Sequence, residues 1–134
     1  MKPTSVLDAS ALLAYLHDEP GADRVTEALE HGCAISAANW AETLSRLADA
    51  DKGPDEVTAA LREQGLLNAA IHVVAMDEEA AREVARLRPL TKKAGLSLGD
   101  RACLALGHLL RLPVLTTDRV WNDLGLDIDV VVVR

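Results

Sequence analysis

The chain has 134 residues, which suits one ordinary domain whose core is large enough to fold without disulfides or structural metals. Its formal net charge of -7 argues against broad electrostatic attraction to a nucleic-acid backbone, because that attraction comes from Lys and Arg displacing counterions. A local basic patch stays compatible with this charge. We therefore expect a single domain over residues 1–134.

The cysteines and the start of the chain indicate a cytoplasmic protein. Cys33 and Cys103 lie in apolar stretches far apart, and neither belongs to a metal knuckle or a disulfide framework, so we expect both to be reduced and buried. No apolar run approaches the roughly 20 residues that span a bilayer. The segment from Met1 to Pro3 leads straight into a strand without a signal-peptide pattern. We expect no membrane contact.

The first half of the chain alternates between strand and helix patterns. Leucines at helical spacing follow a short β-rich run, and the pair Pro20 and Gly21 then breaks the helix. The predicted elements are, in chain order, a strand at residues 4–7, a helix at 9–17, an amphipathic helix to about residue 30, a strand at 33–36 and a long helix through residue 50.

The second half continues the alternation after Gly53 and Pro54. We predict a helix at residues 55–67, a strand at 71–75, a helix at 77–87, a loop near 89–96, a helix at 98–112, a strand at 113–116, a short helical turn and a strand at 128–133. The last strand contains four consecutive valines, which is typical of a strand covered on both faces. The sequence therefore predicts the α/β class, with a central parallel sheet of about five strands and helices on both faces.

Four acidic residues are placed where such a sheet gathers functional groups. Asp8 and Asp118 fall at the ends of predicted strands, while Glu42 and Asp100 lie at or near the starts of helices. Ligands of open α/β sheets bind outside the carboxyl ends of the strands, where the strand order reverses. Carboxylates crowded into one crevice are usually neutralised by hard cations or protons. A metal-dependent hydrolase is the leading hypothesis.

Each acid also has a purely structural interpretation, which is helix capping. Asp8 and Asp118 suit N-caps, Ser97 to Asp100 fits a capping box, and Asn39 to Glu42 has similar spacing. Capping alone would scatter acids over any helix start. Convergence of all four on one edge of the sheet is what favours a functional site.

Other catalytic chemistry finds little support. The four histidines are dispersed, none pairs with Cys or Ser in a nucleophile motif, and we expect surface or helix-end positions for them. No segment resembles a glycine-rich phosphate loop. A phosphatase with an aspartyl nucleophile would have a second Asp two residues after Asp8, and Ser10 occupies that place.

Positive residues concentrate around Asp100. Arg82 and Arg86 suit surface pairs with neighbouring glutamates as well as they suit substrate contact. Lys92 and Lys93 are the better candidates for binding a substrate.

Four segments together resemble the PIN-domain nucleases, and within them the VapC-type toxins of toxin–antitoxin pairs. The resemblance spans nearly the whole chain and keeps the order and spacing of the segments. The segments are Val6-Leu7-Asp8-Ala9-Ser10-Ala11-Leu12-Leu13, Asn39-Trp40-Ala41-Glu42, Leu96-Ser97-Leu98-Gly99-Asp100-Arg101-Ala102-Cys103-Leu104-Ala105 and Leu115-Thr116-Thr117-Asp118-Arg119-Val120-Trp121. Each motif is weak alone, and four in register are a strong signal.

The resemblance implies a Mg²⁺- or Mn²⁺-dependent endoribonuclease that cuts a cellular RNA. Its acidic residues map onto Asp8, Glu42, Asp100 and Asp118. Ser10 and Thr116 are similar to the hydroxyls that accompany them, and we interpret Trp121 as a packing residue. The resemblance also implies a homodimer and a small VapB-type antitoxin whose tail lies in a groove beside the active site.

The chemistry of the residues suggests a division of roles. Asp8 and Asp100 are the first choices for direct metal ligands, Asp118 completes the shell or holds water, and Glu42 orients a water or a second metal. Lys92, Lys93 or Arg101 steadies the scissile phosphate. The sequence leaves the number of metals and the RNA target open.

Two alternatives stay open, a non-catalytic acidic binding module and a housekeeping PIN nuclease without an antitoxin. Apolar helices near residues 11–16, 40–47 and 57–67 carry more Leu and Ala than a small core needs to hide, which suits either core packing or a partner surface.

Overall fold

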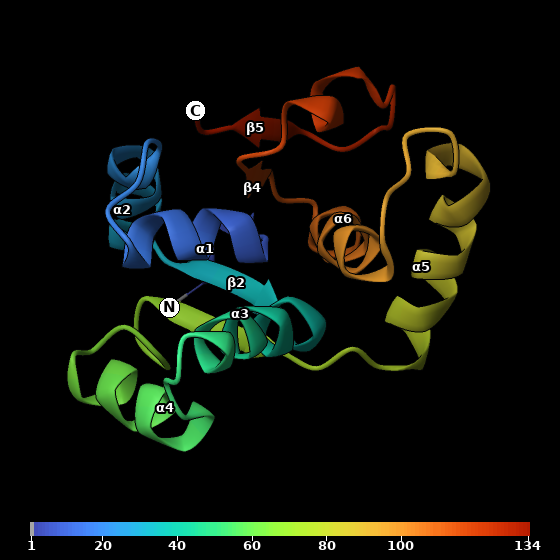
Figure 1. Ribbon diagram of the computed structural model, residues 1–134. Helices are drawn as coiled ribbons and strands as arrows, with labels where there is room; N and C mark the ends of the chain where they lie inside the picture. The colour runs from blue at the N-terminus through green and yellow to red at the C-terminus, as the bar shows by residue number, and fades with distance from the viewer. Residues whose placement is uncertain (1) are drawn as a thin grey trace.

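The computed structural model describes residues 2–134 (Figure 1). Its five strands form one sheet in which every neighbouring pair is parallel. The spatial order is β3-β2-β1-β4-β5. The strands are β1 (Ser5–Leu7), β2 (Cys33–Ser36), β3 (Ile71–Val74), β4 (Val114–Thr116) and β5 (Val130–Val132). The chain builds outward from β1 to β3 and then returns to the other side of β1, so the strand order reverses between β1 and β4. The predicted parallel sheet of five strands is confirmed.

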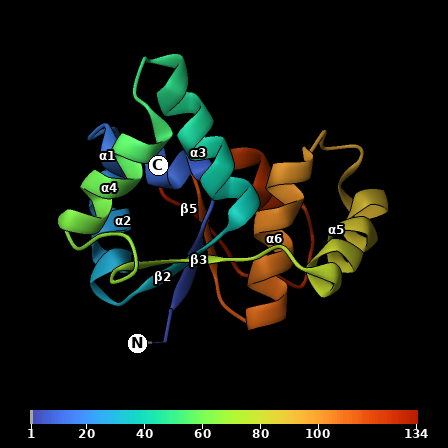
Figure 2. The same ribbon diagram turned by 90° about the horizontal axis from the view of Figure 1, so that it is seen from below.

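Six α-helices and one short 3₁₀ helix connect the strands within residues 2–134. They are α1 (Ala9–Leu16), α2 (Ala22–Glu30), α3 (Ala37–Asp49), α4 (Pro54–Glu63), α5 (Glu78–Thr91), α6 (Leu98–Leu110) and the 3₁₀ helix η1 (Arg119–Asp123). In Figure 2, α1, α2 and α4 lie on one side of the sheet, and α6 lies on the other with α5 packed outside it.

Alternating side chains of the strands feed two separate hydrophobic clusters. Leu7 and Ile35 pack against apolar residues of α1, α2 and α4, whereas Val6, Ala34 and Val114 pack against α5 and α6. Successive strand residues point to opposite faces, so a sheet that is apolar on both needs helices on both. The prediction of helices on both faces is confirmed.

Two predicted boundaries differ from the structure. The helix expected over residues 55–67 ends at Glu63, because Gly65 adopts a left-handed φ of 74° that turns the chain back. The helix expected to stop at residue 87 continues past Pro89 to Thr91. Thr91 is fully buried, and its hydroxyl donates to the Leu87 carbonyl over 2.8 Å, so the last turn is anchored despite the proline.

Other expectations for the interior hold. Cys33 and Cys103 are free and buried, as predicted, and Trp121 is buried in the cluster on the α6 side, which confirms its packing role. His17 and His31 follow the ends of helices, but His72 is half-buried within β3 and so differs from the expected surface position. Within the described residues, no helix is long and apolar enough to cross a membrane.

Candidate metal centre

The four acidic side chains line one cavity of about 140 Å³ at the carboxyl end of the sheet. Asp8 directly follows β1, and Asp118 lies two residues beyond β4, so these two flank the point where the strand order reverses. Glu42 comes from α3, and Asp100 comes from the first turn of α6. Four elements that are distant in sequence thus contribute one carboxylate each.

Asp8 is the most confined of the four, with 5% of its surface exposed. Burial raises the pKa of its carboxyl to about 6, and the charge of Asp100 adds to the rise. Hydrogen bonds from Thr116, Ala11 and Ser10 oppose the rise. The raised value means that the folded chain holds this carboxylate at a cost, which a proton or a cation would relieve.

Two hydroxyls fasten Asp8 to the end of β4. Thr116 Oγ1 donates to Asp8 Oδ2 over 2.6 Å, and Ser10 Oγ lies 2.7 Å from Oδ1 and 2.9 Å from Oδ2. The same hydroxyls accept from the following backbone, since Ser10 Oγ receives the Thr117 N–H and Thr116 Oγ1 receives the Asp118 N–H. The ends of β1 and β4 are therefore locked together through side chains, which fits the accompanying role predicted for Ser10 and Thr116.

Capping and convergence occur in the same residues. Asp8 Oδ1 accepts from the Ala11 N–H, Asp118 Oδ1 accepts from the Val120 N–H, and Ser97 and Asp100 form a reciprocal capping box. Each of these caps engages one carboxylate oxygen. Within residues 2–134, the second oxygens of Asp100 and Asp118 have no hydrogen-bond donor. The caps fix the three carboxylates, and those of Asp100 and Asp118 each keep one oxygen for a ligand.

The capping interpretation is wrong for the segment from Asn39 to Glu42. Ser36 caps α3 instead, because its Oγ accepts from the Ala38 N–H over 3.2 Å. Asn39 is buried and bonds to α6, and Glu42 lines the cavity.

Cys103 of α6 is buried close to three of the four carboxylates. Burial raises the pKa of its thiol well above the usual value, and the charges of Asp8, Asp100 and Glu42 raise it further. Three of the four carboxylates therefore act on one buried point of α6. The thiol stays protonated, which excludes it as a nucleophile.

The expected substrate-binding cations lie outside the cavity lining. Lys92 and Lys93 are exposed beyond the end of α5, and Arg101 Nη1 donates to the Val84 carbonyl over 3.1 Å, which ties α6 to α5. Arg46 does line the cavity, one helical turn after Glu42 on α3. Sequence reasoning missed Arg46, although the four-residue spacing from Glu42 was a usable signal.

The donor set fits a hard divalent cation. Every charged oxygen that lines the cavity belongs to a carboxylate, which is the ligand that Mg²⁺ and Mn²⁺ prefer. No three His, Cys, Asp or Glu side chains in residues 2–134 are close enough to hold one ion jointly. Mg²⁺ usually takes one or two carboxylates and keeps several waters, so a cavity of this size with separated carboxylates suits it.

The chain matches the PIN domain family over residues 5–126, most of its length. It belongs to that family. Its fold is also similar to solved structures of toxins bound to antitoxins. A toxin–antitoxin complex from Klebsiella pneumoniae has 21% identity and a TM-score of 0.71, with 95% of each chain covered. FitAcB from Neisseria gonorrhoeae has 23% identity and a TM-score of 0.69, covering 94% of this chain and 95% of the other.

A third similar structure, VapBC2 from Rickettsia felis, was solved with a DNA fragment from its promoter. It has 10% identity and a TM-score of 0.72, covering 95% of this chain and 96% of the other. No curated protein matches the chain significantly. At these identities the likeness shows the shared fold, and the predicted PIN-domain membership is confirmed. PIN domains are typically nucleases.

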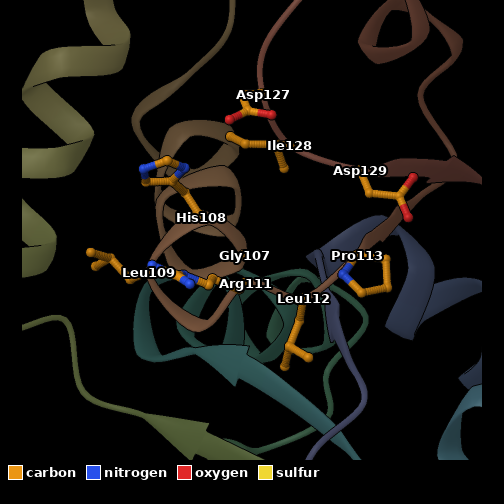
Figure 3. A pocket seen from close by; sticks show the side chains of 9 residues that line it. All are labelled: Gly107, His108, Leu109, Arg111, Leu112, Pro113, Asp127, Ile128 and Asp129. Atoms are coloured by element: carbon orange, nitrogen blue, oxygen red, sulfur yellow. The ribbon is translucent and has the colours of Figure 1, made fainter.

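This PIN domain also has a larger cavity, of about 620 Å³, at the amino end of the sheet. Figure 3 shows that its side chains come from the end of α6, the turn into β4 and the segment before β5. Asp127 and Asp129 project on either side of Ile128 rather than toward one another. Both are exposed, so this cavity does not confine charge as the smaller one does.

Proposed function

We propose that this PIN domain is a Mg²⁺- or Mn²⁺-dependent endoribonuclease, the toxin of a VapBC-type toxin–antitoxin pair acting on a cellular RNA in the cytoplasm. The observation that carries the proposal is the convergence of Asp8, Glu42, Asp100 and Asp118 on one cavity at the carboxyl end of the sheet. Family membership supports nuclease chemistry, and the similar solved structures of toxin–antitoxin complexes support the toxin assignment.

Asp8 and Asp100 are the proposed direct ligands of the cation, since both are fixed by caps and Asp100 lies close enough for its charge to add to the rise that burial causes in the pKa of Asp8. Because no three of the described acidic side chains are close enough to hold one ion jointly, Asp118 holds a water of the ion, and Glu42, with its longer side chain, orients a water or holds a second ion. Hydrogen bonds from Ser10 and Thr116 hold the Asp8 carboxylate in a fixed orientation for binding the cation. A bound divalent cation supplies Lewis acidity toward the phosphate and a water of lowered pKa.

The substrate side of the cavity needs positive charge, because the chain as a whole is negative. Arg46 is the cation that lines the cavity and is placed to contact a phosphate that approaches the carboxylates. Lys92, Lys93 and Arg101 remain proposed contacts for more distant phosphates of the same RNA. In-line attack by the oriented water would then cleave the phosphodiester bond held between Arg46 and the acids.

A groove of this chain beside the acidic cavity is the proposed binding site of the antitoxin. The groove measures about 260 Å³ and is lined by Leu16, Leu47, Val57 and Leu61, among others. The groove and the acidic cavity are adjacent along two helices. On α1, Leu13 lines the cavity and Leu16 lines the groove. On α3, Arg46 lines the cavity and Leu47 lines the groove. An amphipathic antitoxin segment would bury its apolar face there and bring a basic side chain to the acids. A homodimer is proposed as the functional assembly.

A folded Asp8→Asn variant separates this proposal from a non-catalytic binding module. The purified chain, freed of antitoxin, is incubated with total RNA in Mg²⁺ or Mn²⁺, and parallel samples contain EDTA or the variant, whose fold is verified by circular dichroism. We expect metal-dependent cleavage that both EDTA and the substitution abolish. RNA left intact by the folded wild-type chain in either metal would reject the nuclease. A housekeeping nuclease would cleave RNA but have no short antitoxin gene beside its own.

A further inference from the structure

One side-chain hydrogen bond joins the two helices that carry Glu42 and Asp100. Asn39 lies in the first turn of α3 and is 1% exposed, and its Nδ2 donates to the Gly99 carbonyl over 2.9 Å. Glu42 follows Asn39 by three residues on α3, and Asp100 directly follows Gly99 on α6. The bond therefore ties the helices at the level of their two carboxylates.

Gly99 leaves room for the Glu42 carboxylate. A Cβ on Gly99 would lie 3.0 Å from Glu42 Oε1, which is tighter than nine in ten natural contacts of a Cβ, so the Glu42 carboxylate would have to move. The backbone at Gly99 is right-handed helix, so its conformation does not require glycine. Glycine is unfavourable inside a helix relative to alanine. Lack of space beside Glu42 accounts for its presence at the second position of α6.

Asn39 is retained at a cost as well. Its Oδ1 is buried, and no residue in the described part of the chain donates a hydrogen bond to it. A half-satisfied amide in a buried position is less favourable than an apolar residue of the same size. The hydrogen bond from Asn39 Nδ2 to α6 offsets part of this unfavourable free energy.

We propose that Asn39 and Gly99 form a positioning contact that sets the separation of the Glu42 and Asp100 carboxylates in the metal centre. Asn39 holds α6 against α3, and Gly99 lets Glu42 Oε1 approach the start of α6. Neither residue lines the acidic cavity, so the contact would act through Glu42 and Asp100. The proposal rests on the function proposed above, because it assigns the spacing of the carboxylates to metal binding.

Gly99→Ala is the sharpest test, because its new methyl group meets the end of a flexible side chain rather than backbone. Three quantities are measured on the full chain: Mn²⁺ affinity by calorimetry, RNA cleavage rate and melting temperature in EDTA. We expect an unchanged or higher melting temperature, since alanine favours helix. We expect Mn²⁺ affinity and cleavage rate to fall about 10- to 100-fold, as for partners that orient metal ligands.

Two further variants isolate the mechanism. Gly53→Ala is the matched control, since a Cβ there lies 3.7 Å from Glu56 at the start of α4, and it should leave Mn²⁺ affinity and cleavage rate unchanged. In a Glu42→Ala background the added methyl group of Gly99→Ala has nothing to displace, so it should lower Mn²⁺ affinity no further. Asn39→Leu, which removes the donor at similar size, should reproduce the loss of Mn²⁺ affinity with the fold intact.

The outcomes separate this inference from the function on which it rests. A wild-type chain that binds Mn²⁺ and cleaves RNA, together with a Gly99→Ala variant that does both equally well, would overturn the positioning contact and leave the nuclease standing. Loss of cooperative melting in Gly99→Ala would assign Gly99 to packing and overturn the contact too. A wild-type chain that neither binds Mn²⁺ nor cleaves RNA would reject the proposed function and this inference with it.

Discussion

The two ends of the sheet carry similar acidic side chains but arrange them differently. At the carboxyl end, four carboxylates from four elements line a cavity of about 140 Å³, and one of them, Asp8, is buried. At the amino end, Asp127 and Asp129 border a cavity of about 620 Å³, and both are exposed. Exposed carboxylates are stabilised by bulk water, whereas confined ones need a cation or a proton. The burial of Asp8 among converging carboxylates, rather than cavity size, locates the candidate metal centre.

Removing one charge from the carboxyl end should have the largest effect. Asp100→Asn keeps an oxygen that can accept the Ser97 N–H, so the cap of α6 persists while the carboxylate is lost. We expect RNA cleavage to fall by more than about 100-fold, since loss of a ligand exceeds the effect of losing an outer partner. Initial rates on one RNA fragment in Mn²⁺ measure this. The exposed acid Asp49, changed to Asn, is the control, and equal rates for the two variants would remove Asp100 from the centre.

The confinement of Asp8 should appear as a pH dependence of stability in EDTA. Folding raises the pKa of Asp8 from 3.8 to about 6, so the folded chain binds this proton more tightly than the unfolded chain does. The stability that the proton contributes is present below pH 3.8 and is lost as the pH rises through about 6, amounting to about 3 kcal/mol.

Asp8→Asn removes this titration. Urea unfolding at a series of pH values should therefore show the variant gaining stability relative to the wild type as the pH rises from about 4 to 7. A difference that does not change with pH would mean that Asp8 is not confined as the structure describes.

Loosening the hydroxyl link should have an intermediate effect. Thr116→Val removes the donor to Asp8 Oδ2 at nearly constant volume, so Asp8 loses the hydrogen bond that most opposes its raised pKa. We expect Mn²⁺ affinity and cleavage rate to fall about 10- to 100-fold. Thr58→Val, which removes a hydroxyl bonded within α4, is the matched control. Similar affinities for both variants would show that the link does not orient Asp8.

Changes at the amino end should have the smallest effect. Asp129→Asn alters an exposed side chain beside the larger cavity, and we expect the cleavage rate to stay within about twofold of the wild type. The same assay on the same RNA provides the measurement. A loss as large as that of Asp100→Asn would break the contrast between the two ends and place catalytic groups at the larger cavity.

Local sequence patterns were enough to predict the sheet and half of the site. The valine run of β5 indicated a strand covered on both faces, and Asp8 and Asp118 were placed by their positions just beyond the ends of strands. Glu42 and Asp100 lie within helices, where a carboxylate is equally typical of a solvated surface or a cap. Their assignment needed the four motifs together, because no local pattern tells which helix faces meet.

The features that local patterns did not predict depend on how helices pack. Asn39 was interpreted as part of a cap, but its side chain donates a hydrogen bond to α6. Arg46 lines the cavity because of the orientation of α3 relative to the sheet. Pro89 suggested the end of a helix, but a buried Thr91 keeps the last turn in place. In each case the packing of the helix decides the outcome, and the local pattern does not contain that information.

The most direct test of the convergent centre is Mn²⁺ binding to the purified full chain, followed by electron paramagnetic resonance. Asp8 follows β1 and Asp118 lies two residues beyond β4, so a centre built from these carboxylates should need both of them. We predict that the wild type and Asp129→Asn bind Mn²⁺ alike, and that Asp8→Asn and Asp118→Asn each lose this binding while keeping the fold. Equal Mn²⁺ binding by all four proteins would contradict a metal centre built from these carboxylates.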